Sequence, residues 1–492
     1  METLHNVLMG FSVALEPVNM FFCFIGVVLG TLVGVLPGLG PVAAISLLLP
    51  VTFKMSPISA IIMLSGIYYG AMYGGSTTSI LVNIPGEAAS IITCIDGYQM
   101  ARQGRAGPAL GISAIGSFIG GTFSVLMLML LAPLLGRAAL RFGPPEYFSL
   151  MVFGLTLLTY ISKGSILKAS MMGLAGLFIG SIGMDPISGL ERFTYGKTVL
   201  MDGVGLVPMA MGMFGVAEVL TNLEEITEQD ILQTKVKNIW PNWKDWTESR
   251  WAVLRGSVVG FFLGILPGPS ATIASFVSYA IEKKVSKHPE KFGTGAIEGV
   301  AGPESANNAA VGGAFIPLFS LGIPANIVMA LFFGALMIHG VQPGPLFIAD
   351  NPNLFWGFIT SMYVGNALLV ILNLPLIGLW VKLLKVPYHL LFPLILIFCL
   401  IGVYTLNNNT SEILIMLIFG IIGYLMRKFE YDGAPFLIAV VLGPMMENNL
   451  RQSLLISKGA LTIFFTRPIS VSFLLAALIM ALTLVRQQFK IK

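Results

Sequence analysis

The sequence predicts an all-α polytopic membrane protein built from two homologous halves. Of its 492 residues, 55% are hydrophobic and only 11% are charged, whereas a soluble domain carries about 25% charged residues. Apolar stretches near the roughly 20 residues that cross a bilayer recur along nearly the whole chain, so we expect roughly 11 to 13 membrane-embedded helices. In addition, a series of Gly and Pro residues in the first half returns in the same order in the second.

Five regions follow from this pattern. We expect a short N-terminal interfacial segment (1–17), a first transmembrane repeat (18–220), a polar connecting loop (221–250), a second transmembrane repeat (251–450) and a C-terminal segment with a final transmembrane helix (451–492). The connecting loop is rich in charged residues and carries interleaved tryptophans, which is typical of a segment at a membrane surface.

The repeat is clearest in two glycine-rich stretches. Residues 26–40 read GVVLGTLVGVLPGLG and residues 256–270 read GSVVGFFLGILPGPS, so five Gly and Pro positions match at one offset (264 − 34 = 230). Further pairs follow in order, among them Gly74-Gly75 with Gly312-Gly313 and Ile84-Pro85 with Ile323-Pro324. Such internal repetition indicates that each half forms the same structural unit.

The basic residues in the loops favour halves that are inverted relative to the membrane. Lys and Arg near span ends mark the cytoplasmic side. The loop 162–168 is basic where its equivalent 405–412 is not, and the reverse holds for 181–185 and its equivalent at Arg427 and Lys428. A third pair of loops is basic in both halves and does not fit. We predict inverted repeats whose broken helices or re-entrant hairpins meet near the membrane midplane.

In each glycine-rich stretch, the glycines spaced four residues apart (the glycine stripe, 26–34 and 256–264) are followed by Leu-Pro-Gly. This sequence predicts a helix break inside the membrane. Irregular backbone is tolerated there only where it is buried in protein or lines a water-filled cavity. The half-helix that follows begins with free amides and a partial positive charge, which suit an anion. A kink used only for packing is the alternative, but two breaks at equivalent positions favour a binding site. The predicted substrate-binding residues are Pro37, Gly38, Gly40, Pro267, Gly268 and Ser270.

Two further segments, 68–86 and 302–325, combine small residues with hydroxyl and amide side chains. Such groups can donate hydrogen bonds to a carboxylate, and their oxygens can hold Na⁺. The alternative is that they only join neighbouring helices. From these segments we predict substrate-binding residues Ser76, Thr77, Thr78, Ser305, Asn307 and Asn308, and cation-binding residues Ser79, Asn83 and Glu304.

Acidic residues in apolar stretches are costly and mark function by default. They are Glu87, Asp96, Glu298, Glu304 and Glu447. The chain has no Walker A, HExxH or GxSxG pattern, and its three cysteines have no metal-site spacing, so the residues for ATP hydrolysis, zinc proteolysis or serine hydrolysis are missing. We therefore expect no enzyme activity, no metal site and no cofactor.

Taken in order, the motifs resemble the large membrane permease subunit of the tripartite tricarboxylate transporters (TctA type). The resemblance rests on the two Leu-Pro-Gly sequences, Tyr-Gly-Gly-Ser-Thr-Thr-Ser, Asn83-Ile-Pro-Gly and Gly302-Pro-Glu-Ser-Ala-Asn-Asn, between about residues 20 and 450. One departure is that Pro269-Ser270 follows the second Leu-Pro-Gly where Leu39-Gly40 follows the first, so the two tips need not contact the same ligand.

This resemblance implies a multi-pass permease of the bacterial inner (plasma) membrane. It implies uptake of tri- or dicarboxylates such as citrate by cation symport, with Na⁺ as the expected coupling ion and H⁺ as the alternative. The implied partners are a small integral-membrane subunit, an extracytoplasmic solute-binding protein, the carboxylate solute and the lipid bilayer. Nucleic acid is not expected, because the net charge of +4 is small and lies in loops.

Membrane energetics agree with cation coupling. Moving one negative charge into a cell held at 100 mV negative costs about 2.3 kcal/mol, so a dianion or trianion faces roughly 5–7 kcal/mol. An anion or ion channel, or another secondary transporter for small organic anions, is the alternative interpretation. An intramembrane enzyme would need a close acid/base or nucleophile pair, and the sequence offers no persuasive one.

Overall fold

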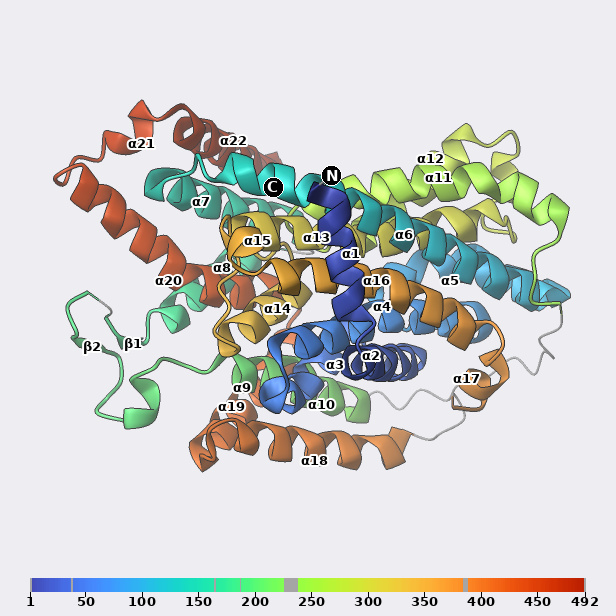
Figure 1. The fold of residues 1–492 in the computed structure, drawn as a ribbon, viewed down its shortest axis with the longest axis horizontal. Coiled ribbons are helices and arrows are strands. Elements are labelled where there is room, and N and C mark those ends of the chain that lie inside the picture. The colour runs from blue at the N-terminus through green and yellow to red at the C-terminus, as the bar shows by residue number, and fades with distance from the viewer. Residues whose placement is uncertain are drawn as a thin grey trace.

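The computed structural model describes residues 2–36, 39–162, 165–185, 187–224, 238–383 and 388–490. These residues are almost entirely helical, and their one sheet is a pair of two-residue strands (Figure 1). By length and composition, six described helices can cross a membrane, and six further apolar helices are shorter. The predicted all-α class with several apolar helices is confirmed.

The elements divide between the two halves. The first half comprises α1 (Glu2–Ala14), α2 (Pro17–Val35), α3 (Pro41–Leu48), η1 (Leu49–Lys54), α4 (Pro57–Val82), η2 (Ala88–Ser90), α5 (Ile91–Met100), η3 (Ala101–Arg105), α6 (Ala106–Ala139), α7 (Pro144–Ile161), α8 (Ile166–Gly180), β1 (Gly183–Met184), β2 (Glu191–Arg192), η4 (Thr198–Leu200), α9 (Leu206–Ala210), η5 (Met211–Val216) and α10 (Ala217–Glu224).

The second half begins with α11, which packs beside α13. It comprises α11 (Trp243–Ile265), α12 (Ser270–Val285), η6 (Pro289–Lys291), α13 (Glu298–Leu321), α14 (Ile327–Ile338), α15 (Phe347–Asp350), α16 (Pro352–Asn373), α17 (Ile377–Leu383), α18 (Tyr388–Asn407), α19 (Thr410–Lys428), α20 (Gly433–Ile456), α21 (Ile463–Thr466) and α22 (Pro468–Lys490).

Two helices, α4 and α13, form the centre of the bundle. Nearly every residue of each is buried, and a helix buried on all sides belongs to the core of a large bundle. Both carry the segments rich in small and hydroxyl or amide residues. The polar residues singled out from the sequence therefore lie in the interior.

The glycine stripes explain how each half packs. Gly30 of α2 lies so close to α4 that an added Cβ would overlap the carbonyl oxygen of Ile67. Gly260 of α11 has the same relation to the carbonyl oxygen of Ala306 on α13. Each stripe lets two helix backbones meet without intervening side chains. The pair α2 and α4 is thus repeated as the pair α11 and α13.

Helix ends repeat as well. Helix α4 ends before Asn83 (φ 61°) and α13 ends before Gly322 (φ 71°), both left-handed residues, at an offset of 322 − 83 = 239. Glu87 and Asn326 then precede the next helices at the same offset, with φ of −148° and −150°. The duplicated unit is therefore visible in backbone detail, whereas its inversion across the membrane stays a prediction.

The two predicted helix breaks are present. Helix α2 ends at Val35 and α3 begins at Pro41, while α11 ends at Ile265 and α12 begins at Ser270. In the second break, Gly268 has a φ of 128°, a conformation that favours glycine. Pro37 and Gly38 lie outside the described residues. The depth of both breaks in the membrane stays a prediction.

Among the described residues, helical structure extends into both ends of the predicted connecting loop (221–250). Helix α10 continues to Glu224, residues 225–237 lie outside the description, and α11 already begins at Trp243. The early start has a local cause: the side chain of Asn242 accepts from the amide of Asp245, whose carboxylate accepts from the amide of Asn242. This capping box fixes the helix start, although the residues after it are polar.

Candidate functional site

A cavity of about 660 Å³, here called the break cavity, lies where the two helix breaks face each other. It receives Gly40 from the first break, and Gly268 and Ser270 from the second. The first turns of α3 and α12 add Pro41, Val42, Ala271 and Thr272, and Pro269 precedes α12. The rest of the wall comes from α4, α7, η2, α14 and α20, through Tyr68, Met72, Leu158, Glu87, Ala88, Ala89, Asn326, Ile327, Val328, Ala434 and Ile438, and from the turn Glu430–Asp432.

Four helices of eight residues or more begin at this cavity: α3, α12, α14 and α20. Amides in the first turn of a helix have no partner within the helix and carry a partial positive charge. The side chains of Asn326 and Asp432 cap α14 and α20. In contrast, α3 and α12 have no side-chain cap among the described residues. The starts of α3 and α12, one in each half, therefore leave the amides of their first turns available to bind an anion.

Ser270 supplies a further donor at the start of α12. Its side chain is 3% exposed and lines the cavity, and its hydroxyl has no partner among the described residues. The turn before it is fixed, because the amide of Gly268 donates to the carbonyl of Ala325 at 2.8 Å. A buried hydroxyl without a partner is costly. Ser270 is thus placed to bind a ligand that accepts a hydrogen bond.

None of the described residues lining the cavity is Lys, Arg or His. Its ionisable groups include carboxylates, and the most enclosed of these is Glu87, which is 7% exposed. One oxygen of Glu87 accepts from the amide of Ala89 at 2.5 Å, and the other has no partner among the described residues. The cavity therefore offers neutral donors on one wall and a carboxylate on another.

The two halves contribute equivalent positions. Gly40 corresponds to Ser270 (270 − 40 = 230), and Glu87 corresponds to Asn326 (326 − 87 = 239). All four line the cavity. Binding sites at the interface of two structural repeats are a common feature of transporters. The backbone positions are shared, but the chemistry differs, because Glu87 is acidic and Asn326 is neutral.

Glu304 forms a second polar centre. It is fully buried on α13, and its carboxylate accepts from Ser76 of α4 at 2.6 Å, from Thr93 of α5, and from Ser117 of α6 at 3.4 Å. A buried carboxylate is unfavourable unless it is hydrogen-bonded, paired with a cation or protonated. Three hydroxyls from three helices thus surround this acid, and their oxygens retain lone pairs.

Helix α4 connects the two polar centres. A Cβ added at Gly75 would lie 2.8 Å from Cγ of Glu87, and the next residue, Ser76, donates to Glu304. The wall of the cavity and the buried acid therefore contact adjacent residues of the same helix.

The predicted residues of α4 and of its C-terminal end have different surroundings. Ser76 joins Glu304, as described above. Thr77 borders a very small space of about 10 Å³ beside Tyr73, and Thr78 donates to the carbonyl of Val35 at 2.8 Å, which holds the end of α2. Ser79 donates to Ser90 at 2.9 Å. Asn83 is exposed and ends α4 by its left-handed backbone.

The predicted cation group of Ser79, Asn83 and Glu304 is therefore not brought together. Ser79 and Asn83 lie toward the end of α4 and act in local caps and hydrogen bonds, which is the role that short polar side chains take near helix ends. Glu304 is surrounded instead by Ser76, Thr93 and Ser117.

The predicted second-half residues stay on α13. Ser305 donates to the carbonyl of Gly302 at 2.9 Å. Asn308 donates to the side chain of Asn307 at 2.5 Å and to the carbonyl of Glu304 at 3.0 Å. Pro267 is half-buried in the turn before α12. None of these four predicted residues lines the break cavity.

The hydroxyl and amide segments do not correspond residue by residue. Packing gives an offset of 239, at which Ser76 corresponds to Phe315 and Asn307 to Tyr68. The two clusters of polar residues therefore lie at different positions of the repeated unit. They meet because α4 contacts α13, not because they occupy equivalent positions.

Several residues of the site were not predicted. Thr93 and Ser117 lie in apolar helices where nothing local marks them. Asn326 carried a usable signal, because it follows Ile323-Pro324 at the spacing at which Glu87 follows Ile84-Pro85. The equivalence of these two residues was therefore available from the repeat.

Two of the other buried or half-buried acids have structural roles. Asp96 accepts from the amides of Gly293, Gly295 and Ala296 at 2.8–2.9 Å, and so fastens α5 to the loop before α13. Glu447 accepts two hydrogen bonds from Arg192 at 2.9 and 3.0 Å. These partners account for both carboxylates without a ligand.

Together, the duplicated helical unit, the paired helix breaks and the cavity between the halves define a polytopic membrane protein with a candidate binding site at a repeat interface. The model of the tripartite tricarboxylate transporter TctA family matches residues 20–438, and the chain belongs to this family. It is therefore a membrane protein of a transporter family.

Two relatives come from Agrobacterium vitis. An uncharacterized 52.8 kDa protein in the TAR-I ttuC' 3' region is 52% identical over 485 residues, covering 98% of this chain and 97% of the relative. An uncharacterized protein in the TAR-II ttuC' 3' region is 55% identical over 215 residues, covering 44% of this chain and 89% of the relative. No solved structure matches the chain.

Proposed function

We propose that the chain is the permease subunit of a tripartite secondary transporter, which takes up tri- or dicarboxylates by cation symport across the bacterial inner membrane. It works with a small integral-membrane subunit and an extracytoplasmic solute-binding protein. Membership of the TctA family supports the transporter class. The solute class, the coupling and the partners are the additional content of this proposal.

One observation carries the solute assignment: the uncapped starts of α3 and α12 and the hydroxyl of Ser270 converge on the break cavity. A carboxylate accepts hydrogen bonds from such donors and is stabilised by the helix dipoles. Citrate-like solutes carry several carboxylates, and two donor groups, one from each half, can bind two of them.

The charge balance of the cavity supports cation coupling. No basic side chain among the described lining residues neutralises a bound anion, and Glu87 adds negative charge. A multiply charged anion would therefore bind weakly unless cations bind with it. Glu304 with Ser76, Thr93 and Ser117 provides carboxylate and hydroxyl oxygens for Na⁺, or a carboxylate that takes up H⁺.

Ser270→Ala tests the solute site in proteoliposomes that contain the complete transporter. Loss of one hydrogen bond to a charged group costs about 1.5–3 kcal/mol, so KM for the carboxylate should rise by roughly 10- to 100-fold. Ser278→Ala is a matched control on the same helix, because Ser278 is also buried and its hydroxyl has no partner among the described residues, but it does not line the cavity.

An unchanged KM in Ser270→Ala, with normal protein amount, would remove the start of α12 from the solute site. Equal increases for Ser270→Ala and Ser278→Ala would assign the effect to packing of α12. Accumulation of solute against its gradient, driven by Na⁺, separates the transporter from the channel alternative, since a channel only equilibrates solute.

A further inference from the structure

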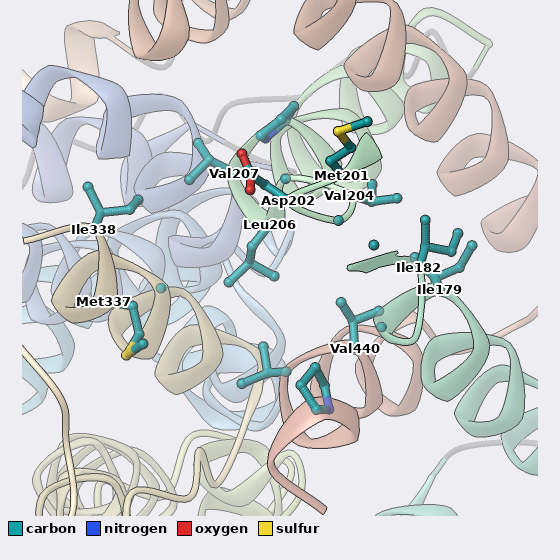
Figure 2. Close-up of a pocket in the computed structure, with 18 of the residues that line it drawn as sticks. Ile179, Ile182, Met201, Asp202, Val204, Leu206, Val207, Met337, Ile338 and Val440 are labelled. Carbon is teal, nitrogen blue, oxygen red and sulfur yellow. The ribbon is translucent and has the colours of Figure 1, made fainter. Parts of the chain in front are cut away.

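A second cavity of about 770 Å³, here called the hairpin cavity, contains none of the substrate-binding or cation-binding residues predicted from the sequence. It lies beside the β1–β2 hairpin, between the end of α8, the start of α9, and the later parts of α14 and α20. Figure 2 shows Met337 and Ile338 of α14 on one side of this cavity and Ile179 and Ile182 on another.

Two helices line both cavities, at opposite ends. Helix α14 contributes Val328 to the break cavity and Met337 to the hairpin cavity. Helix α20 contributes Ala434 and Ile438 to the break cavity, and Val440 and later residues to the hairpin cavity. The two cavities therefore follow one another along the same pair of helices.

Helix α19 runs between the two cavities in the opposite direction. Glu412 in its first turn lines the hairpin cavity, and Glu430 just beyond its end lines the break cavity. The two residues are 430 − 412 = 18 positions apart, or about 27 Å along a helix. This is close to the hydrocarbon thickness of a bilayer, about 30 Å, and α19 is apolar enough to cross it. The cavities thus reach opposite ends of one membrane span.

Each cavity contains a carboxylate that needs a polar ligand. Glu87 in the break cavity and Glu412 in the hairpin cavity are each 7% exposed, and each has one oxygen without a partner among the described residues. Such oxygens require water or a cation. Each of the two carboxylates is therefore placed to bind water or a cation in its cavity.

A thin apolar layer separates the two cavities. On α20, Ile438 and Val440 border different cavities although they are only two residues apart, about 3 Å along the helix. On α14 the corresponding residues are Met329–Phe332, all fully buried. A hydrophobic constriction of this kind blocks the passage of ions and polar solutes.

We propose that the hairpin cavity is the opposite entrance of the solute path that contains the break cavity, and that the layer formed by Ile438, Val440 and Met329–Phe332 is its closed gate. This inference rests on the proposed transport function. It adds the route of the solute and the position of the barrier. Neither follows from the break cavity alone or from membership of the family.

Cysteine accessibility from the two sides of the membrane tests the route. Ala434→Cys and Met337→Cys place one thiol in each cavity, on a Cys94→Ser background because Cys94 is the one native cysteine that is not buried. In vesicles of both orientations, a membrane-impermeant thiol reagent should label the two variants from opposite sides. Leu437→Cys, fully buried and lining neither cavity, is the control that should stay unlabelled. Labelling of both cavities from the same side would overturn the proposal.

Thinning the apolar layer tests the gate. Adding Ile438→Ser to the Ala434→Cys variant should let the reagent reach the introduced thiol from the hairpin-cavity side, at least tenfold faster than before. Leu437→Ser is the matched control, because Leu437 is the adjacent fully buried residue of α20 and should not open this route. No increase with Ile438→Ser, or an equal increase with Leu437→Ser, would overturn the gate.

These labelling experiments do not depend on the identity of the solute. If carboxylate uptake fails while labelling comes from opposite sides, the solute assignment is wrong and the path stands. If uptake succeeds while labelling comes from one side, the proposed function stands and the path is wrong.

Discussion

The two halves of the molecule meet at the break cavity with the same backbone and different side chains. Glu87 and Asn326 precede equivalent helices with nearly equal φ angles, and Gly40 and Ser270 lie at the starts of α3 and α12. The first half contributes the carboxylate of Glu87 and, at Gly40, a position without a side chain. The second half contributes the side-chain amide of Asn326 and the hydroxyl of Ser270. We propose that the two halves divide the work at this cavity, with a cation favoured beside Glu87 of the first half and a carboxylate beside Ser270 of the second.

The glycines that pack the paired helices are the same in both halves. Gly30 and Gly260 both allow a helix backbone to approach within the space of a missing side chain. Close backbone packing leaves no freedom at such positions, while residues that face a cavity can change without disturbing the fold. The comparison therefore separates the residues that pack the duplicated unit from the residues that determine the chemistry of each copy at the cavity.

The largest effect is expected for Glu304→Gln, which tests whether the cation is bound between the halves. The substitution keeps the shape but removes the charge that would bind Na⁺ or H⁺, so cation-driven uptake should fall by at least about 100-fold, equivalent to about 2.7 kcal/mol. Uptake in proteoliposomes as a function of Na⁺ measures this. Glu298→Gln, at the partly exposed start of α13, is the control. An unaltered Na⁺ dependence in Glu304→Gln would exclude this carboxylate from coupling.

Exchanging the charge between equivalent positions tests the division of work directly. Glu87→Gln should weaken the apparent cation affinity, and Asn326→Asp should weaken the apparent carboxylate affinity through repulsion. Each effect should be about 10- to 100-fold, as expected for an interaction with a charged group of about 1.5–3 kcal/mol. Half-saturation concentrations for solute and Na⁺ are measured for both variants. Because cation and solute binding are linked, both half-saturation constants change in each variant. The constant for Na⁺ should change more in Glu87→Gln, and the constant for the solute should change more in Asn326→Asp. Equal changes of both constants in the two variants would contradict the proposed division between the halves.

A smaller, equal effect in both halves is expected for Gly30→Ala and Gly260→Ala. Each new methyl group overlaps a backbone carbonyl, and overpacking costs about 1–3 kcal/mol. Thermal unfolding in detergent should show a lowered Tm of similar size for both variants. Gly154→Ala in α7, where nothing lies within 4 Å of the added Cβ, should leave Tm unchanged or raise it. A normal Tm in only one half would show that the two packed units are not equivalent.

The smallest effect is expected for Gly40→Ser, which gives the first half the residue of the second. An added Cβ at Gly40 meets nothing within 4 Å, and its φ of −71° suits any residue. The new hydroxyl would be a second donor opposite Ser270, and one hydrogen bond contributes about 0.5–1.5 kcal/mol. Carboxylate KM should therefore fall about two- to tenfold with normal protein amount. A raised KM would show that solute binding at the start of α3 requires the absence of a side chain at position 40.

Much of this architecture could be predicted from the sequence, because its signals are local. Low charge and long apolar stretches predict membrane helices, Leu-Pro-Gly predicts helix breaks, and GxxxGxxxG predicts close backbone packing. Glu304 could be singled out, since an acid in an apolar stretch is too costly to be incidental. The order of Gly and Pro residues also identified the repeat and the family resemblance.

The composition of the site was decided only by the tertiary structure. Thr93 and Ser117 surround Glu304 because α5 and α6 turn those faces toward α13, and neither residue differs locally from any other polar residue in an apolar helix. In contrast, Thr78 and Asn83, which looked like ligands, hold or end helices. A side chain near a helix end can satisfy the local backbone or a distant ligand, and the sequence pattern is the same in both cases.

The cavities themselves depend on packing between segments far apart in the chain. The break cavity needs the start of α3, near residue 41, beside the starts of α12, α14 and α20, near residues 270, 327 and 433. Local propensity determines where each helix begins, because capping and Pro or Gly act over a few residues. Which helix starts converge, and that α14 and α20 each line two cavities, is determined by how the helices pack against one another across the two halves.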